Sequence, residues 1–319
     1  MLKLHFLNVG DGDCCIVELP GHTTVVDINK SKSIGPKASK EIIGAIKSKY
    51  PDKNLGKIDS EDPKALENAG YTIQPQDPIE YIKENKISSI FRFISTHPHM
   101  DHLRHFAELT ETVDISNLWI IDNKFGPDKK LDKKSRKSDW STYTQFRDSD
   151  SISIEEEASA KFNVVRPMEK AADNFYKPDN IKILSPNIDL VKTAEDDGNQ
   201  NVMSYVLLIE YGPHKIVLGG DAEQENWKYI LENYADLIKD VTILKASHHG
   251  RETGFYEPAV EQMKPKYTIQ SVGNTMKPKD DAVKKYKELS KNVITTRWKG
   301  NVVIECHEDG RIECTPQFK

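Results

Sequence analysis

The stretch THPHMDH, residues 96–102, follows an apolar run at Ile90–Ser95 that predicts a buried strand. Three histidines and one aspartate fall within six residues of this stretch. Side chains two residues apart in extended backbone point the same way, so His97 and His99 can bind one metal ion together. Pro98 favours this geometry because it keeps His97 out of the helical region.

The segment then turns into a helix predicted at Leu103–Thr110, which directs Asp101 and His102 toward a second point nearby. Imidazole and carboxylate ligands suit zinc, manganese or iron. A His-rich surface loop is the alternative interpretation, but ten histidines in 319 residues would seldom place three at this spacing by chance. We therefore predict a metal site here.

Other chemically interesting residues also follow apolar runs that read as strands. Asp27 ends the run that begins at Thr23, Asp221 follows Lys215–Gly219, and His249 follows Val241–Ala246. Strand ends that meet at one edge of a sheet can build a site on a rigid frame. We expect these residues to join the histidine segment there.

Composition describes an ordinary protein with 37% hydrophobic and 30% charged residues. The net charge of −5 excludes a polycation that coats nucleic acid without specificity. No run approaches the roughly 18 apolar residues of a membrane helix, and the N-terminus reads as a strand, not a signal peptide. Four cysteines without a CxxC pair argue against a thiolate zinc site. We expect a cytoplasmic protein.

The chain is predicted to form a single domain over residues 1–319 with two surface inserts, near residues 30–75 and 122–158. Both inserts interrupt the alternation of strands and helices with polar sequence. They are candidate docking surfaces for a partner subunit. The chain closes with a hairpin predicted at Val302–Cys314.

Taken together, the motifs resemble the metallo-β-lactamase superfamily, through residues 97–102, Gly220-Asp221 and His248-His249-Gly250. A closer resemblance is to the C-terminal hydrolase domain of the ComEC DNA-uptake channels and their stand-alone relatives. This resemblance is carried by FLNVGDGD at 6–13, VVD at 25–27, Asn201-x-x-Ser204 and SHHG at 247–250. It implies an α/β fold, the four-layer αββα metallo-β-lactamase sandwich, with the site at one edge.

The resemblance also implies two divalent metal ions, zinc or manganese. His97 and His99 would bind the first ion, and Asp221 would bridge the two. The ligands of the second ion would be Asp101, His102 and His249. Asp27 would lie behind the ligands and orient one of the imidazoles, as metal-bound histidines usually require.

Asp101 and His248 are the candidate catalytic residues. His249 directly precedes Gly250, which fits the ligand position of the superfamily. His248 then either contacts substrate, donates a proton to the leaving group, or is merely packed. His105 is predicted to lie on a helix face, and four further histidines are expected to be structural: His5, His22, His214 and His307.

One segment departs from the superfamily pattern. Many members carry a further histidine on the loop before the strand that precedes Gly-Asp, whereas this chain reads DDGNQN at 196–201. The ComEC-like branch has a similar Asn-rich segment. The first metal ion would therefore rely on Asp221, water and substrate, or bind weakly, or prefer manganese.

The leading functional hypothesis is a phosphodiesterase or nuclease acting on DNA or RNA. Two ions a few ångströms apart can turn a shared water into a bridging hydroxide nucleophile near neutral pH. Lys124–Lys137 carries six Lys and one Arg against two Asp, and Trp140 and Tyr143 follow. Cations can contact phosphates and aromatic rings can stack on bases. A solvated loop is the alternative interpretation of this insert.

Two other functions stay open. Relatives also cleave small phosphoesters such as phosphorylcholine groups, and wider superfamily members open lactones and thioesters. The chain could instead serve as a non-catalytic binding or signalling subunit with a decayed site, although the nearly intact ligand set argues against this.

Overall fold

The computed structural model describes residues 1–31, 75–127, 134–149, 163–168, 177–273, 276 and 278–318. Its strands form two sheets. The eight-stranded sheet has the order β14-β13-β1-β2-β3-β4-β5-β6, and the six-stranded sheet has the order β12-β11-β10-β9-β8-β7. The eight strands are β1 (Leu2–Phe6), β2 (Cys15–Glu18), β3 (Thr23–Val26), β4 (Ser89–Ile94), β5 (Asp114–Trp119), β6 (Asn163–Val165), β13 (Val302–Cys306) and β14 (Ile312–Pro316). The six are β7 (Ile181–Ser185), β8 (Val206–Tyr211), β9 (His214–Leu218), β10 (Ile243–Lys245), β11 (Tyr267–Gln270) and β12 (Asn292–Thr295).

Helices cover the outer face of each sheet, except for the helix Ile188–Asp197, which contributes Leu190, Val191 and Ala194 to the core between the sheets. Those of the N-terminal half are α3 (Pro78–Glu84), α4 (Met100–Leu103), α5 (Phe106–Thr112) and α6 (Lys134–Arg147). The others are α8 (Ile188–Asp197), α9 (Gln224–Tyr234), α10 (Glu257–Met263), α11 (Val283–Leu289) and α12 (Thr296–Lys299). Short 3₁₀ turns lie at η1 (Lys177–Asp179), η2 (Gln200–Met203), η3 (Ser247–Gly250) and η4 (Pro278–Asp280).

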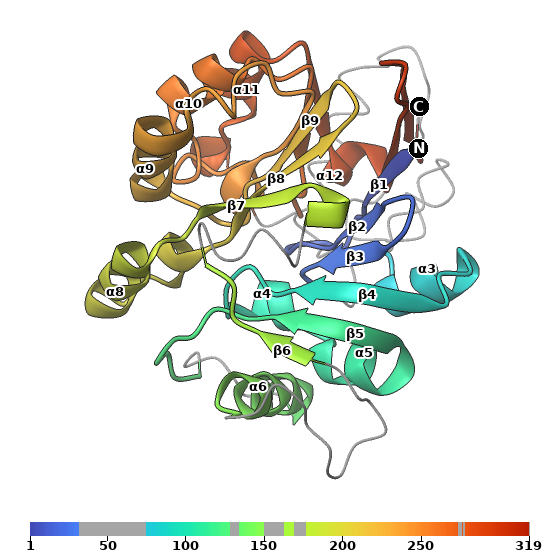
Figure 1. Ribbon diagram of the computed structural model, residues 1–319, viewed down its shortest axis with the longest axis vertical. Helices are drawn as coiled ribbons and strands as arrows, with labels where there is room; N and C mark the ends of the chain where they lie inside the picture. The colour runs from blue at the N-terminus through green and yellow to red at the C-terminus, as the bar shows by residue number, and fades with distance from the viewer. Residues whose placement is uncertain are drawn as a thin grey trace, which may run out of the picture.

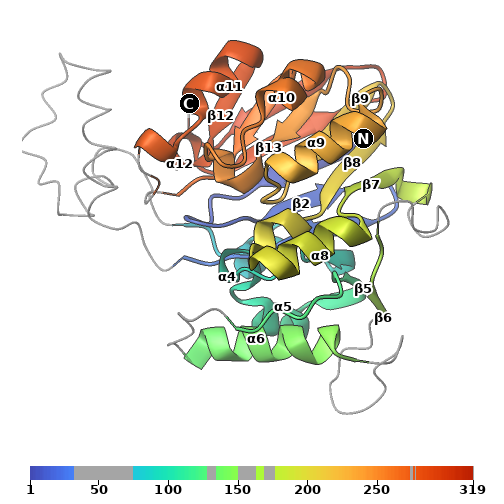
Figure 2. The ribbon, with the colours of Figure 1, turned by 90° about the vertical axis from the view of Figure 1, so that its left-hand side faces the viewer.

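Three apolar clusters define the layers. Strand β8 contributes to two of these clusters, because successive side chains of a strand point to opposite faces of the sheet. Leu207 and Ile209 face the core between the two sheets, whereas Val206 and Leu208 face α9–α11. A third cluster packs the first sheet against α3–α6. Figures 1 and 2 place α9–α11 and α5–α6 at opposite ends of the stack. The predicted four-layer αββα sandwich is confirmed.

The first predicted insert falls largely outside the described residues, because 32–74 are not among them. The second insert was predicted to be a polar surface segment, and this prediction is wrong for part of the insert. Residues 134–147 form α6, and Trp140, Tyr143 and Phe146 are buried in the cluster beneath it. Trp140 is 8% exposed and Tyr143 is 1% exposed. Neither ring offers a face for base stacking, so that expectation is corrected.

The predicted helix at Leu103–Thr110 is also corrected, because the chain forms two helices there. Arg104 ends α4, and His105 precedes α5 with a left-handed φ of 74°. No helix in the described part of the chain is long and apolar enough to cross a membrane.

Candidate metal centre

The predicted site residues meet where the two sheets end at the same edge. In the first sheet β3 and β4 run parallel, and in the second sheet β9 and β10 do. Asp27 follows β3, the histidine segment follows β4, Asp221 follows β9 and the His248-His249 pair follows β10. Parallel neighbours carry their C-terminal ends to one edge, so residues far apart in sequence share one site.

His102 is fixed from behind by Asp27. The Nδ1 atom of His102 lies 2.7 Å from Asp27 Oδ2, and Thr96 donates its backbone N–H to Asp27 Oδ1 at 2.8 Å. With Nδ1 directed at the carboxylate, Nε2 is the ring nitrogen left to bind a metal ion. This atom lies 3.2 Å from Asp221 Oδ2 and is buried without a hydrogen-bond partner in the described protein. It is therefore oriented as a metal ligand.

His249 is held in the same way from the other sheet. Its Nδ1 atom lies 3.1 Å from the carbonyl oxygen of Ser271. Its Nε2 atom lies 3.3 Å from Asp101 Oδ2 and 3.6 Å from Asp221 Oδ2. The structure thus brings together the four side chains predicted around the second ion: Asp101, His102, Asp221 and His249.

The protonation of these imidazoles reflects the surrounding carboxylates. Burial alone would lower the pKa of both rings, but the carboxylates outweigh it. Asp221 and Asp27 raise the pKa of His102 well above its usual value, and Asp221 and Asp13 raise the pKa of His249 to about 10. The carboxylates therefore favour a cation, either a proton or a metal ion, at these two imidazoles. A divalent ion would replace those protons.

His97 and His99 form the other side of the site. Their Nε2 and Nδ1 atoms lie 2.9 Å apart, and His97 Nε2 is 3.7 Å from Asp221 Oδ2. Burial lowers the pKa of both rings, with a further contribution from positive charge on His102. Neutral imidazoles are the form that binds metal. The segment at 196–201 contributes no histidine to this side.

Asp221 joins the two halves. Two groups of ligand atoms each lie within 4.8 Å of one another, and Asp221 belongs to both. The groups are His97, His99 and Asp221, and Asp13, His102, Asp221 and His249. The donor set of imidazoles and carboxylates, with the buried Nε2 atoms of His102 and His249 that have no hydrogen-bond partner in the described protein, fits two divalent ions. The individual ligand roles stay predictions.

Asp13 is a site residue that sequence reasoning missed. Its Oδ2 atom lies 3.5 Å from His249 Nδ1 and 3.9 Å from His102 Nδ1. These are the ring edges already bonded to Ser271 and Asp27, so Asp13 lies behind the imidazoles, whereas Asp101 faces Nε2. Asp13 also pairs with the buried Lys245. A signal was present in Lys245, a lysine at the end of the apolar strand β10.

Unusual backbone conformations aim several of these side chains. Asp27, His248 and His249 have left-handed φ angles of 58°, 50° and 57°, which cost on the order of 1–3 kcal/mol each. Gly12 permits a close approach, because a Cβ atom there would lie 2.4 Å from the Asp101 carbonyl oxygen. The Asp13 N–H donates to that same oxygen at 3.1 Å. The β1–β2 loop therefore packs directly on the histidine segment.

His248 lies at the rim of the site, outside both ligand groups. Its Nε2 atom is 3.9 Å from Asp221 Oδ2. Its Nδ1 atom contacts Thr253 Oγ1 at 2.7 Å and Glu223 Oε1 at 3.3 Å. Glu223 was not predicted from sequence. It accepts hydrogen bonds from the side-chain amides of Asn199 and Asn201, both at 2.9 Å, so the segment without a histidine supports His248 instead.

The remaining histidines lie in other contacts. His105 begins α5 and bonds Glu108 at 2.6 Å. The other four contact neighbours away from the site, His5 with Glu18, His22 with Asp179, His214 with the His307 carbonyl, and His307 with Glu313.

Comparison with known proteins gives partial matches. No protein-family model matches the chain. A segment of 91 residues is 33% identical to ComE operon protein 3 of Bacillus subtilis (strain 168), covering 28% of this chain and 11% of that protein. The metallo-β-lactamase fold protein YhfI from Bacillus subtilis is 11% identical, with a TM-score of 0.46 over 98% of this chain and 100% of that one. The isothiocyanate hydrolase from Delia radicum gut bacteria is 10% identical, with a TM-score of 0.46 over 99% and 100%.

Proposed function

We propose that this protein is a metal-dependent phosphodiesterase with DNA or RNA as its substrate. The observation that carries the metal-dependent part is the convergence of the His102 and His249 Nε2 atoms on Asp221, within 3.2 and 3.6 Å of its Oδ2 atom. Hydrogen bonds from their Nδ1 atoms fix both rings in this orientation. Such prearranged ligands are typical of a metal site rather than of a structural histidine.

His97 and His99 would hold one ion, Asp101, His102 and His249 the other, and Asp221 would contact both. When bound, a pair of divalent ions activates water and neutralises charge on the attacked group. Asp27 and the Ser271 carbonyl hold the imidazole rings of His102 and His249 in a fixed orientation. Asp101 has a side chain that is 38% exposed, so it faces the side from which substrate arrives.

His248 supplies the acid–base group of the proposal. Glu223 and Thr253 hold its Nδ1 edge, so Nε2 lies toward the centre, 3.9 Å from Asp221 Oδ2. From there the ring can give a proton to the leaving oxygen, a contribution of about 10²–10⁴-fold in rate. The neighbouring Ser247 is not suited as a nucleophile, because it is buried and donates its hydroxyl to the Gly219 carbonyl.

The choice of a nucleic acid is supported by the resemblance to ComEC-type hydrolases and by the 91-residue match to ComE operon protein 3. The basic insert adds exposed charge at Lys124, whose side chain is 90% exposed. The rest of its lysine run up to residue 136 lies outside the side chains that the structure describes.

The test is a cleavage assay on single- and double-stranded DNA and RNA with manganese, zinc or magnesium. Bis(p-nitrophenyl) phosphate, phosphorylcholine esters, a lactone and a thioester are assayed in parallel. The matched control is the double variant Asp101→Ala, His102→Ala. Metal-dependent cleavage of nucleic acid that the control lacks supports the proposal. If only a small ester is cleaved, the substrate is that class of ester and not a nucleic acid. If a sample that holds two metal ions cleaves none of these substrates, the proposed hydrolytic activity is contradicted.

A further inference from the structure

Lys245 is a charged residue in an otherwise apolar position. Lys245 is the last residue of β10, and its neighbours Ile243, Leu244 and Ala246 are fully or almost fully buried. Lys245 itself is only 4% exposed. Removing an ammonium group from water costs several kcal/mol unless a partner compensates. The contacts of this ammonium group therefore indicate what it is retained for.

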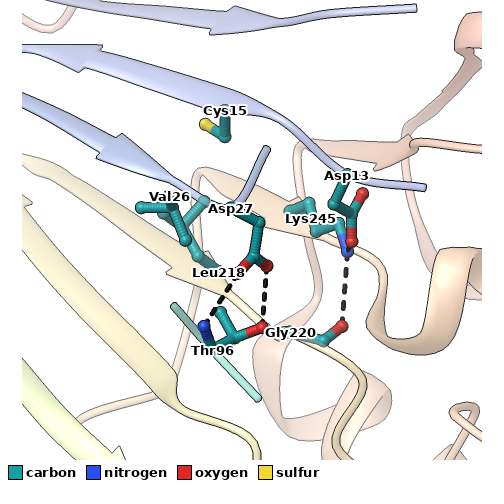
Figure 3. Close-up of a pocket in the computed structure, with 8 residues that line it drawn as sticks. All are labelled: Asp13, Cys15, Val26, Asp27, Thr96, Leu218, Gly220 and Lys245. Carbon is teal, nitrogen blue, oxygen red and sulfur yellow. Dashed lines mark hydrogen bonds and ion pairs between the residues drawn. The ribbon is translucent and has the colours of Figure 1, made fainter. Parts of the chain in front are cut away.

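The ammonium group has two partners at the base of the centre. It forms an ion pair with Asp13, which is 3% exposed, and it donates to the Gly220 carbonyl oxygen at 3.3 Å. Gly220 directly precedes Asp221, the carboxylate common to both ligand groups. Figure 3 shows Lys245, Asp13, Gly220 and Asp27 around one small cavity of about 10 Å³, which is room for roughly one water.

Asp13 carries this contact to the imidazoles. It belongs to the β1–β2 loop of the first sheet, whereas Lys245 belongs to the second sheet, so the pair connects the two sheets beneath the site. From there Asp13 Oδ2 lies 3.5 Å from the Nδ1 atom of His249. Lys245 thus contacts two groups: the Gly220 carbonyl, which directly precedes Asp221, and the Asp13 carboxylate, which lies behind His249.

We propose that Asp13 and Lys245 are a positioning pair for the metal centre: Asp13 supports His249 from behind, Lys245 fixes the peptide before Asp221, and neither binds metal. This inference rests on the metal centre of the proposed function. The rival arrangement makes Asp13 a direct ligand, as its place among the close ligand atoms allows. The two arrangements differ in what happens when both members of the pair are removed together.

The experiment compares Asp13→Asn, Lys245→Met, the double variant of both, and Asp101→Asn. The affinity for zinc or manganese is measured by competition with a chromophoric chelator, and cobalt absorption reports the ligand field. Each single variant leaves one buried charge uncompensated. We expect the single variants to lose about 10–100-fold in metal affinity, the range seen when groups behind metal ligands are removed.

The double variant decides between the arrangements. A positioning pair predicts that the double variant binds metal about 10–100-fold more weakly than wild type, no worse than the single variants because no charge is left unpaired, with an unchanged cobalt spectrum. Full recovery to wild-type affinity would overturn the inference, because the centre would then not need the pair. A direct ligand predicts that the double variant stays as weak as Asp101→Asn and that its spectrum changes, which would overturn the inference. The exposed pair Lys285–Glu252 provides the control, as Lys285→Met with Glu252→Gln should leave the metal affinity unchanged.

Folding is followed by melting of the metal-free proteins. If a single variant does not fold, the comparison of the double variant with Asp101→Asn still applies. A double variant that does not fold overturns the inference, because the pair would then serve the fold and not the centre. Metal binding without phosphodiester cleavage in wild type would contradict the proposed substrate and leave this inference standing. Absence of metal binding in wild type would overturn both.

Discussion

Asp27 shows how much of the centre depends on a residue that need not touch metal. Its carboxylate accepts from His102 Nδ1, Thr96 N and Thr96 Oγ1, so it sets both the tautomer and the orientation of one ring. A left-handed φ of 58° brings it into that position. The same logic applies to the Ser271 carbonyl behind His249.

We expect Asp27→Asn to lower metal affinity by about 10–100-fold, because an amide in place of the carboxylate no longer favours the donating Nδ1–H of His102. Chelator competition measures the effect. Asp179→Asn is the matched control, since Asp179 also backs a histidine, His22, but away from the centre. Equal affinity in wild type and Asp27→Asn would contradict the role given to Asp27.

We expect His248→Gln to reduce the rate on nucleic acid by about 10²–10⁴-fold, because the leaving oxygen loses its proton donor. Metal content should stay at the wild-type level, since His248 lies outside both ligand groups. A substrate with p-nitrophenolate as leaving group needs less protonation and should lose less activity. An equal loss on both substrates would contradict proton donation, and a loss of bound metal would make His248 a ligand.

At the scale of elements, α6 replaces an expected polar loop. Its aromatic residues pack into the outer core with Phe106 of α5, and Tyr143 also receives a hydrogen bond from Asn123 at 2.8 Å. Asp139 adds two contacts to the start of α5, accepting from His105 N at 3.0 Å and Ala107 N at 3.1 Å. The helix therefore supports the element that follows the histidine segment.

We expect Trp140→Ala to lower the free energy of unfolding by about 3–5 kcal/mol, the usual cost of removing a buried aromatic ring. Denaturant titration measures it. Ser141→Ala on the exposed side of the same helix is the control. If Trp140→Ala left stability unchanged and weakened only nucleic-acid binding, the ring would be a binding residue after all.

At the scale of the whole molecule, the centre lies where the two sheets meet and is built from both. Its candidate ligands come from the segment after β4, which includes α4, on one side and from the segments after β9 and β10 on the other. Four carboxylates gather there, and a metal ion would offset their mutual repulsion. The stability of the sandwich should therefore depend on the occupied centre.

We expect chelation of metal to lower the melting temperature. Ions present at about 100 times their dissociation constant contribute roughly 2.7 kcal/mol per site to the folded state. Scans with EDTA and with added zinc or manganese measure the difference. The variant His102→Ala, Asp221→Ala should show no metal-dependent shift. If the melting temperature of the wild-type protein were the same with EDTA and with added metal, a metal centre shared by the two sheets would be contradicted.

The strand ends allowed the convergence of the site to be predicted, and the resemblance to the metallo-β-lactamase superfamily implied the αββα sandwich, whereas the element boundaries were less accurate. The break at His105 was missed because a left-handed residue is not visible in an apolar pattern. The burial of Trp140 and Tyr143 was missed because α6 has weak apolar periodicity, and only packing on α5 shows which side is covered.

The sequence by itself determined the chemistry of the donor set, because the spacing of His97, His99 and His102 is a local property, and its motifs indicated the type of fold through their resemblance to the metallo-β-lactamase superfamily. The resemblance implied Asp27 behind those ligands, whereas only the tertiary structure showed Asp13 and Lys245 there. Asp13 and Lys245 are 232 residues apart in the chain, and Asp27 and His102 are 75 apart. The first contact follows from the face-to-face packing of the two sheets and the second from the pairing of β3 with β4, and no local pattern records either.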